Sequence, residues 1–144
     1  MKPTTFFATI VLGAIVSAGA LGIDAAVDSP PTLMSRADYA DARHGIEAQT
    51  RVALAGCRGE QHVAREICKA RVHGEERVKV AELLARYHGT VAAADDVRIA
   101  KVKAHYDVER ARCNAREDSD REQCLRAARE GRSRAIFARG ASVT

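Results

Sequence analysis

Two stretches of this chain, CRGEQHVAREIC from Cys57 to Cys68 and CNAREDSDREQC from Cys113 to Cys124, decide how the rest of it is interpreted. In each stretch the cysteines stand eleven positions apart, and the second stretch follows the first by fifty-six residues. An Arg-Glu dipeptide precedes the second cysteine of both stretches. We predict that each pair of cysteines forms a disulfide that closes the top of an antiparallel helical hairpin, and that the hairpin occurs twice.

The spacing suits such a disulfide because it places both cysteines at nearly the same height on neighbouring helices. Cys113 stands about three residues before the predicted turn and Cys124 about four after it, at ~1.5 Å of rise per residue. Each closed loop should stabilise the fold by ~3 kcal/mol through the entropy of the unfolded chain. Four cysteines allow three pairings. Cys57 with Cys68 and Cys113 with Cys124 is the favoured one, and bridges between the hairpins are the alternative.

The N-terminal segment predicts export. Residues 1–5 carry one lysine and no acid, residues 6–16 are uncharged and apolar, and the small residues 17–20 follow. This order is typical of a secretory signal peptide, which we place at residues 1–20. The alternative is an uncleaved membrane anchor over residues 6–23. Both alternatives place the body in an oxidising compartment, periplasmic or secreted, where paired cysteines form disulfides.

The body is predicted to be all-α, with four helices that pack as an antiparallel bundle or as an elongated pair of hairpins. Residues 21–34 contain two prolines and no apolar periodicity, and they are expected to form a disordered linker. The helical domain is expected to span residues 35–139, as repeats 35–88 and 91–139, before a tail at 140–144.

Start and stop residues set the expected helix limits. Ser35 and Ser119 each begin a predicted capping box, and Gly59 and Gly89 are expected to end helices. The expected helices therefore cover about 36–59, 63–87, 91–116 and 120–139. Gly74 lies within the apolar stripe of the second helix, where it would permit either a close helix contact or a bend.

The charge of the chain is mixed, with a formal net charge of +4. The basic excess lies in residues 97–144, and arginines of the last predicted helix are candidates for contact with an anionic membrane or polysaccharide. The alternative is a solvated helix face with interspersed ion pairs. The candidate arginines are Arg126, Arg129, Arg132 and Arg134, with Arg139 beyond them. The modest basic excess and the 4% aromatic content argue against nucleic-acid binding.

Catalytic and metal-binding patterns are weak. His62 with Glu66, and His105 with Glu109, stand four apart on predicted helices, but each pair supplies only two metal ligands. We therefore predict no metal site and no cofactor. The chain lacks the nucleophile-elbow, phosphate-loop, zinc-protease and dinucleotide patterns. We expect that it is not an enzyme.

Several short motifs together resemble a known group of proteins. They occur in the order Ser35-Arg36-Ala37-Asp38-Tyr39, Ile46-Glu47-Ala48, Cys57, Cys68, Ala81-Glu82-Leu83, Ala85-Arg86-Tyr87, Ala104-His105-Tyr106-Asp107, Cys113, Cys124. This order is similar to that of small exported proteobacterial helical proteins with two cysteine-paired repeats, some of which are labelled cell-envelope biogenesis or TolA-like. In that group a Lys-Asp pair precedes each second cysteine, whereas Arg-Glu stands here. The resemblance implies export and a repeated helical fold.

We expect a periplasmic helical protein with a structural or protein-binding role at the cell envelope, through an envelope protein as partner. One alternative is a stress-related binder of ligands or unfolded proteins that uses an apolar groove between the hairpins. Another is a protein that contacts anionic surfaces through its arginine-rich last helix.

Overall fold

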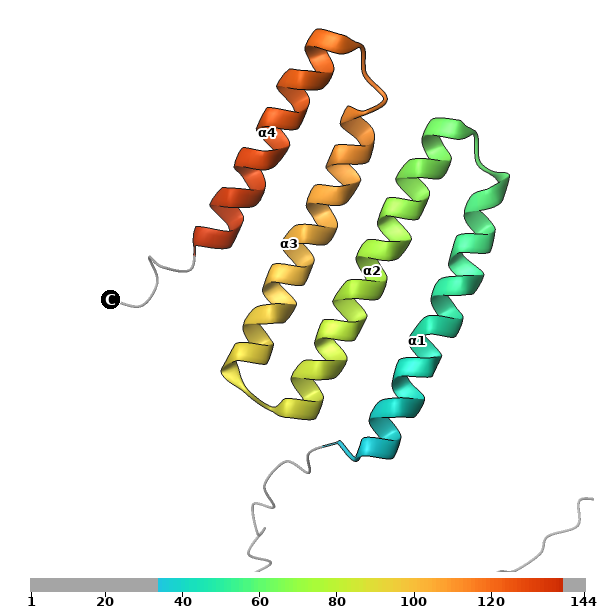
Figure 1. Cartoon of the computed structure of the whole chain (residues 1–144), viewed down its shortest axis with the longest axis vertical. Helices are drawn as coiled ribbons and strands as arrows, with labels where there is room; N and C mark the ends of the chain where they lie inside the picture. Colours follow the sequence, from blue (N-terminus) through green and yellow to red (C-terminus); the bar gives the residue numbers. More distant parts are fainter. Residues whose placement is uncertain (1–33, 139–144) are drawn as a thin grey trace, which may run out of the picture. The chain divides into compact units, whose positions relative to one another are not determined.

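The computed structural model describes residues 34–138, which belong to one compact unit. They form α1 (Arg36–Gly56), a short 3-10 helix η1 (Cys57–Gly59), α2 (His62–His88), α3 (Val91–Cys113) and α4 (Asp118–Phe137), as Figure 1 shows. The predicted all-α class with four helices is confirmed. The expected signal peptide, the linker up to residue 33, Arg139 and the tail lie outside the described residues.

Capping side chains begin two of the helices where the sequence indicates. The Ser35 hydroxyl accepts a hydrogen bond from the Asp38 amide at 3.0 Å, and the Thr90 hydroxyl accepts one from the Ala93 amide at 3.2 Å. Gly89 ends α2 in the left-handed conformation, with φ of 63°. A residue without a Cβ adopts this conformation at little cost, so the reversal from α2 to α3 needs only two residues.

Two predicted boundaries are wrong, and a third differs only in helix type. Gly59 is the last helical residue as predicted, but α1 itself ends at Gly56 and the 3-10 helix η1 covers the last turn. α3 stops at Cys113 rather than Arg116, because the amides of Ala115 and Arg116 donate to carbonyls three residues back and so tighten the chain into a turn. α4 begins at Asp118, so Ser119 lies inside the helix instead of capping it.

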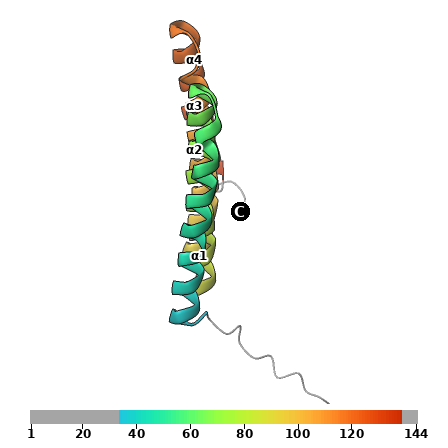
Figure 2. The same ribbon diagram turned by 90° about the vertical axis from the view of Figure 1, so that its right-hand side faces the viewer.

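The four helices form a single layer. Figure 1 shows them side by side in chain order, and Figure 2, turned by 90°, shows the same row edge-on. Each helix of the described region contacts only the helices that precede and follow it in the chain, and α2 with α3 is the most extensive pair. α1 and α4 are therefore edge helices, and the layer has two broad open faces. No helix among the described residues has the length and apolar character needed to cross a bilayer.

Gly74 brings α2 and α3 together at the centre of the layer. A Cβ placed on Gly74 would lie 2.9 Å from the Cβ of Ala104 and 3.2 Å from its Cα. Real Cβ atoms do not approach so closely, so the absent side chain is what permits this contact. Of the two roles that the sequence left open for Gly74, the structure supports the close helix contact.

Burial within the layer is sparse. Only six described residues are buried, namely Ile46, Cys57, Gly74, Leu83, Ala93 and Cys113. Leu83, which is fully buried, is not part of the predicted apolar stripe of α2, whereas Val63, which is part of it, is 46% exposed. The predicted stripe consists of Val63, Ile67, Ala70, Gly74, Val78, Ala81 and Leu84. A helix in the middle of a single layer has two lateral contacts, so one apolar stripe does not describe it.

Polar and aromatic pairs supplement this small core. Tyr39 of α1 stacks with Tyr87 of α2 at 4.8 Å between ring centroids. The Lys101 ammonium lies 2.9 Å from the Glu82 carboxylate, which joins α3 to α2. At the end of α4, Arg98 of α3 donates hydrogen bonds to the carbonyls of Ala135 and Ile136, at 3.0 and 3.2 Å. These carbonyls lack partners within their own helix, so Arg98 satisfies the C-terminus of α4 from outside.

Candidate functional site

The two disulfides occupy equivalent places in the two hairpins. Cys57–Cys68 and Cys113–Cys124 have Cα–Cα distances of 5.7 and 5.5 Å, within the range that a disulfide requires. Cys68 and Cys124 are each the seventh residue of their helix, α2 and α4. The predicted pairing is confirmed, and no bridge joins the two hairpins. No described cysteine is free, so none is available as a nucleophile or metal ligand.

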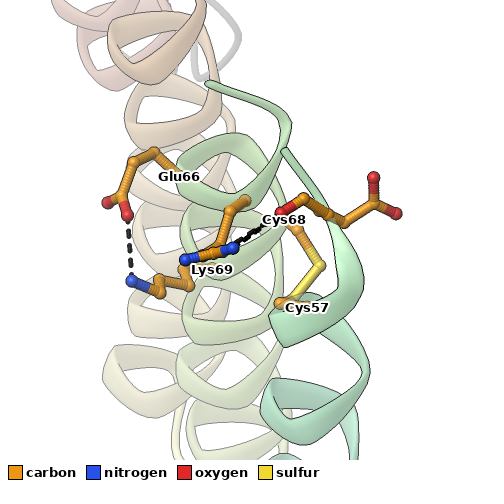
Figure 3. The surroundings of a disulfide bond; sticks show 6 residues. Cys57, Glu66, Cys68 and Lys69 are labelled. Carbon is orange, nitrogen blue, oxygen red and sulfur yellow. Dashed lines mark hydrogen bonds and ion pairs between the residues drawn. A yellow bond between two sulfur atoms is a disulfide. The ribbon is translucent and has the colours of Figure 1, made fainter. Parts of the chain in front are cut away.

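Glu66, one of the candidate metal ligands, is engaged by a lysine. The Lys69 ammonium lies 2.9 Å from the Glu66 carboxylate. Figure 3 shows this pair beside the Cys57–Cys68 disulfide. The hydrogen bond and the positive charge of Lys69 lower the pKa of Glu66, and His62 and Arg65 add smaller effects in the same direction. Glu66 therefore lies among ionisable side chains at the surface of α2.

The second candidate pair lies on the exposed side of α3. His105 is exposed, and the Glu109 carboxylate accepts a hydrogen bond from Arg112 at 2.7 Å. Within residues 34–138, no group of three His, Cys, Asp or Glu side chains is positioned to hold a metal ion. His105 and Glu109 instead form the ridge between two grooves on one face of the layer.

The larger of these grooves lies between α3 and α4 and has a volume of about 990 Å³. Its apolar and small lining residues are Val102, Ala127, Ala128, Gly131 and Ala135, together with the Cys113–Cys124 disulfide and the ring of Tyr106. Its charged lining residues are Lys101, His105, Glu109, Arg116, Asp120 and Arg132. None of the side chains of α4 is buried, so this groove is the incompletely filled seam between two helices.

The four candidate arginines of α4 have different surroundings. Arg132 alone turns into the α3/α4 groove, where its guanidinium lies 4.4 Å from the centroid of the Tyr106 ring. Arg126 and Arg134 are exposed and face Glu122 and Glu130, at 3.3 and 3.7 Å. Arg129 is exposed and has no ion-pair partner among the described residues. The helix thus presents alternating charges outward and one arginine toward α3.

The seam between α2 and α3 is open on both faces. On the face with His105, a groove of about 560 Å³ has Val78, Ala104 and Val108 on its floor. On the opposite face a groove of about 460 Å³ is lined by larger aliphatic side chains. These are Val80, Ala81, Leu84, Ile99 and Ala100, and the charged residues at the rim are Arg43, Glu76, Arg77, Asp96 and Lys103.

Sequence reasoning missed the contact between Arg132 and Tyr106, although the cysteines contain a signal for it. Once Cys113 pairs with Cys124, antiparallel counting brings Tyr106, seven residues before Cys113, beside position 131, seven residues after Cys124. Arg132 is the next residue. The α2/α3 grooves had no comparable signal, because the order of the helices in a layer does not follow from the disulfides.

No protein family, curated protein or solved structure compared with this chain matches it.

Proposed function

We propose that this chain is an exported, non-catalytic helical protein that binds a protein partner at the cell envelope. The observation that carries the proposal is the single layer of helices. Helical domains normally bury their apolar stripes between two packed layers. Here four helices leave two open faces, and six described residues are buried. A partner that lies on the layer would supply the missing second layer.

The aliphatic groove between α2 and α3 is the surface that best fits a protein. Leu84 and Ile99 are half-buried at its centre, and charged side chains of both signs surround them. Protein interfaces share this organisation, with an apolar centre and a polar rim. An amphipathic helix of the partner would place apolar residues at helical spacing along such a groove.

A photo-crosslinking experiment in the cell of origin tests this proposal. A benzoylphenylalanine residue at Lys103, at the rim of the aliphatic groove, is expected to crosslink one defined envelope protein. The matched control is Lys101, which is also exposed but stands two residues away and so on the other side of α3. Equal crosslinking from both positions, or crosslinking only from Lys101, would contradict the proposed surface.

Export is supported by the disulfides and by the resemblance to exported proteins with two cysteine-paired repeats. It is tested separately by alkylating the natively produced protein without reduction. All four cysteines, Cys57, Cys68, Cys113 and Cys124, are expected to resist alkylation until a reductant is added. Recovery of free thiols at these positions would place the body in a reducing compartment and overturn the proposal.

Contact with an anionic membrane or polysaccharide is the second candidate function. The exposed arginines of α4 favour it, although two of them face glutamates. Binding to anionic vesicles at low salt, lost when Arg126 and Arg129 are replaced by glutamine, would support this function. Absence of binding at low salt would exclude it, because charge attraction is strongest there.

A further inference from the structure

We propose that the groove between α3 and α4 binds an amphiphile with a single acyl chain and a carboxylate head. The groove opens on the face of His105, opposite the aliphatic groove of Leu84 and Ile99. Such a ligand and the proposed protein partner would therefore occupy different faces of the layer. Either could bind in the absence of the other.

Arg132 is the group that would hold the carboxylate. Three other arginines of the described region are also half-buried, namely Arg43, Arg65 and Arg98, and each of them donates a hydrogen bond to an oxygen. Arg132 is equally half-buried, but it has no hydrogen-bond acceptor within residues 34–138. Its guanidinium is held over the Tyr106 ring, and none of its N–H donors has an acceptor in the described part of the chain. A guanidinium in this state can donate two parallel hydrogen bonds to one carboxylate.

The charges around Arg132 favour an anion. Lys101, whose ammonium also pairs with Glu82 of α2, and His105 line the same part of the groove, one turn apart on α3. Glu109, the acidic residue of α3 that lines this groove, is already engaged by Arg112. The other acid of the groove, Asp120, lies in the first turn of α4, three turns from Arg132, where Arg116 also lines the groove. The groove lining near Arg132 therefore contains no acidic side chain without a cationic partner.

The remainder of the groove fits an apolar chain. From His105 to Cys113 it follows α3 for about 12 Å, at ~1.5 Å per residue. Along this length the facing residues of α4 include Ala128 and Gly131, whose small side chains leave the space open. The volume of about 990 Å³ lies at the upper end of the range of ~300–1,000 Å³ found for small-molecule sites.

Calorimetry with purified, oxidised protein tests the site, with sodium dodecanoate below its micelle concentration as the probe. Dodecanoate is expected to bind with one molecule per chain. Dodecyltrimethylammonium, which has the same chain and the opposite charge, and sodium acetate, which lacks the chain, are expected to bind at least ten-fold more weakly. Equal affinity for the cationic amphiphile would overturn the role of Arg132, and equal affinity for acetate would overturn the role of the apolar groove.

Two variants locate the site, with far-UV circular dichroism as a check on folding. Arg132→Gln is expected to weaken dodecanoate binding at least ten-fold, whereas the matched control Arg134→Gln, on the exposed side of α4, should leave it unchanged. Gly131→Leu is expected to fill the groove and to abolish binding. A Cβ at Gly131 meets no atom within 4 Å, so this variant should fold. Unchanged binding in either Arg132→Gln or Gly131→Leu would overturn the proposal.

Discussion

Gly74 and Ala104 hold the two hairpins at their closest approach, and a single added methyl group tests this contact. Gly74→Ala should lower the free energy of unfolding by ~1 kcal/mol. Overpacking against Ala104 costs ~1–3 kcal/mol, which exceeds the gain of ~1 kcal/mol in helix propensity. Urea unfolding of the oxidised protein, followed by circular dichroism, measures the change.

Gly45 provides the matched control, since it also lies inside a helix but has no atom within 4 Å of an added Cβ. Gly45→Ala should therefore stabilise the protein by ~0.5–1 kcal/mol. If the two substitutions stabilised the protein equally, α2 and α3 would be further apart than the contact with Ala104 requires.

Glu66 and Lys69 form an exposed ion pair whose effect appears in a titration. Lys69→Met should raise the pKa of Glu66 toward its ordinary value, because Lys69 is the main cause of the lowered pKa. NMR of the Glu66 carboxyl carbon measures this shift, with Lys79→Met as the control. Because the pKa of Glu66 is lower in the folded chain than in the unfolded chain, its ionised carboxylate stabilises the fold at pH values above the unfolded-state pKa. This stabilisation is lost as the pH falls through the folded-state pKa. An unchanged pKa in Lys69→Met would show that the pair does not form in solution.

At the scale of elements, α4 is attached to the layer by few groups. It has no buried side chain, and its described links to α3 are the Cys113–Cys124 disulfide, the hydrogen bonds from Arg98 and the stacking of Arg132 on Tyr106. In the double variant Cys113→Ser/Cys124→Ser, the amides of α4 should lose most of their protection against hydrogen exchange. Loss of this disulfide should lower the free energy of unfolding by ~3 kcal/mol. The amides of α1, α2 and α3 should remain protected against exchange.

The equivalent double variant in the first hairpin is the comparison. After Cys57→Ser/Cys68→Ser, α1 keeps the buried Ile46 and the stacking of Tyr39 on Tyr87. The amides of α1 should therefore lose less protection against hydrogen exchange in this variant than the amides of α4 lose in Cys113→Ser/Cys124→Ser. Equal loss of protection in α1 and α4 would mean that the disulfides alone hold the edge helices.

Elements whose limits depend on local chemistry could be predicted from the sequence. Ser35, Gly89 and Thr90 mark helix ends because their side chains, or the lack of one, act on the adjacent backbone. Ser119 failed as a predicted cap because the start of α4 matches the start of α2 instead. Gln61 and Glu117, fifty-six residues apart, precede these helices with nearly the same backbone angles. The geometry of the repeated hairpin outweighed the preference of one serine.

For the whole molecule, a single layer exposes little new apolar surface when it unfolds. The urea dependence of the free energy of unfolding should therefore lie at the low end of the usual range, near ~1 kcal/mol per molar urea. This urea dependence should be the same at a micromolar protein concentration and at a tenfold higher one. A value above ~2 kcal/mol per molar urea, or one that rises with concentration, would show that copies of the chain cover the open faces of each other.

The layer itself could not be predicted from the sequence, and the grooves depend on it. Helical periodicity identifies the apolar side of a helix, but α2 packs against both neighbours. Leu83 and Gly74 therefore lie on different sides of α2, and no single stripe contains both. The cysteines determine which helices form hairpins. They contain no information on how one hairpin lies against the other, which depends on the contact of Gly74 with Ala104.

The close contact at Gly74 also limits how far this architecture can grow. A shift of fifty-six residues carries Gly74 onto Glu130, and carries Ala104 back onto Ala48. The free edge of α4 therefore has a carboxylate, paired with Arg134, at the place where a further hairpin would require a bare backbone. Tandem addition of a third hairpin through the same joint is blocked sterically and by charge, and the row closes at two.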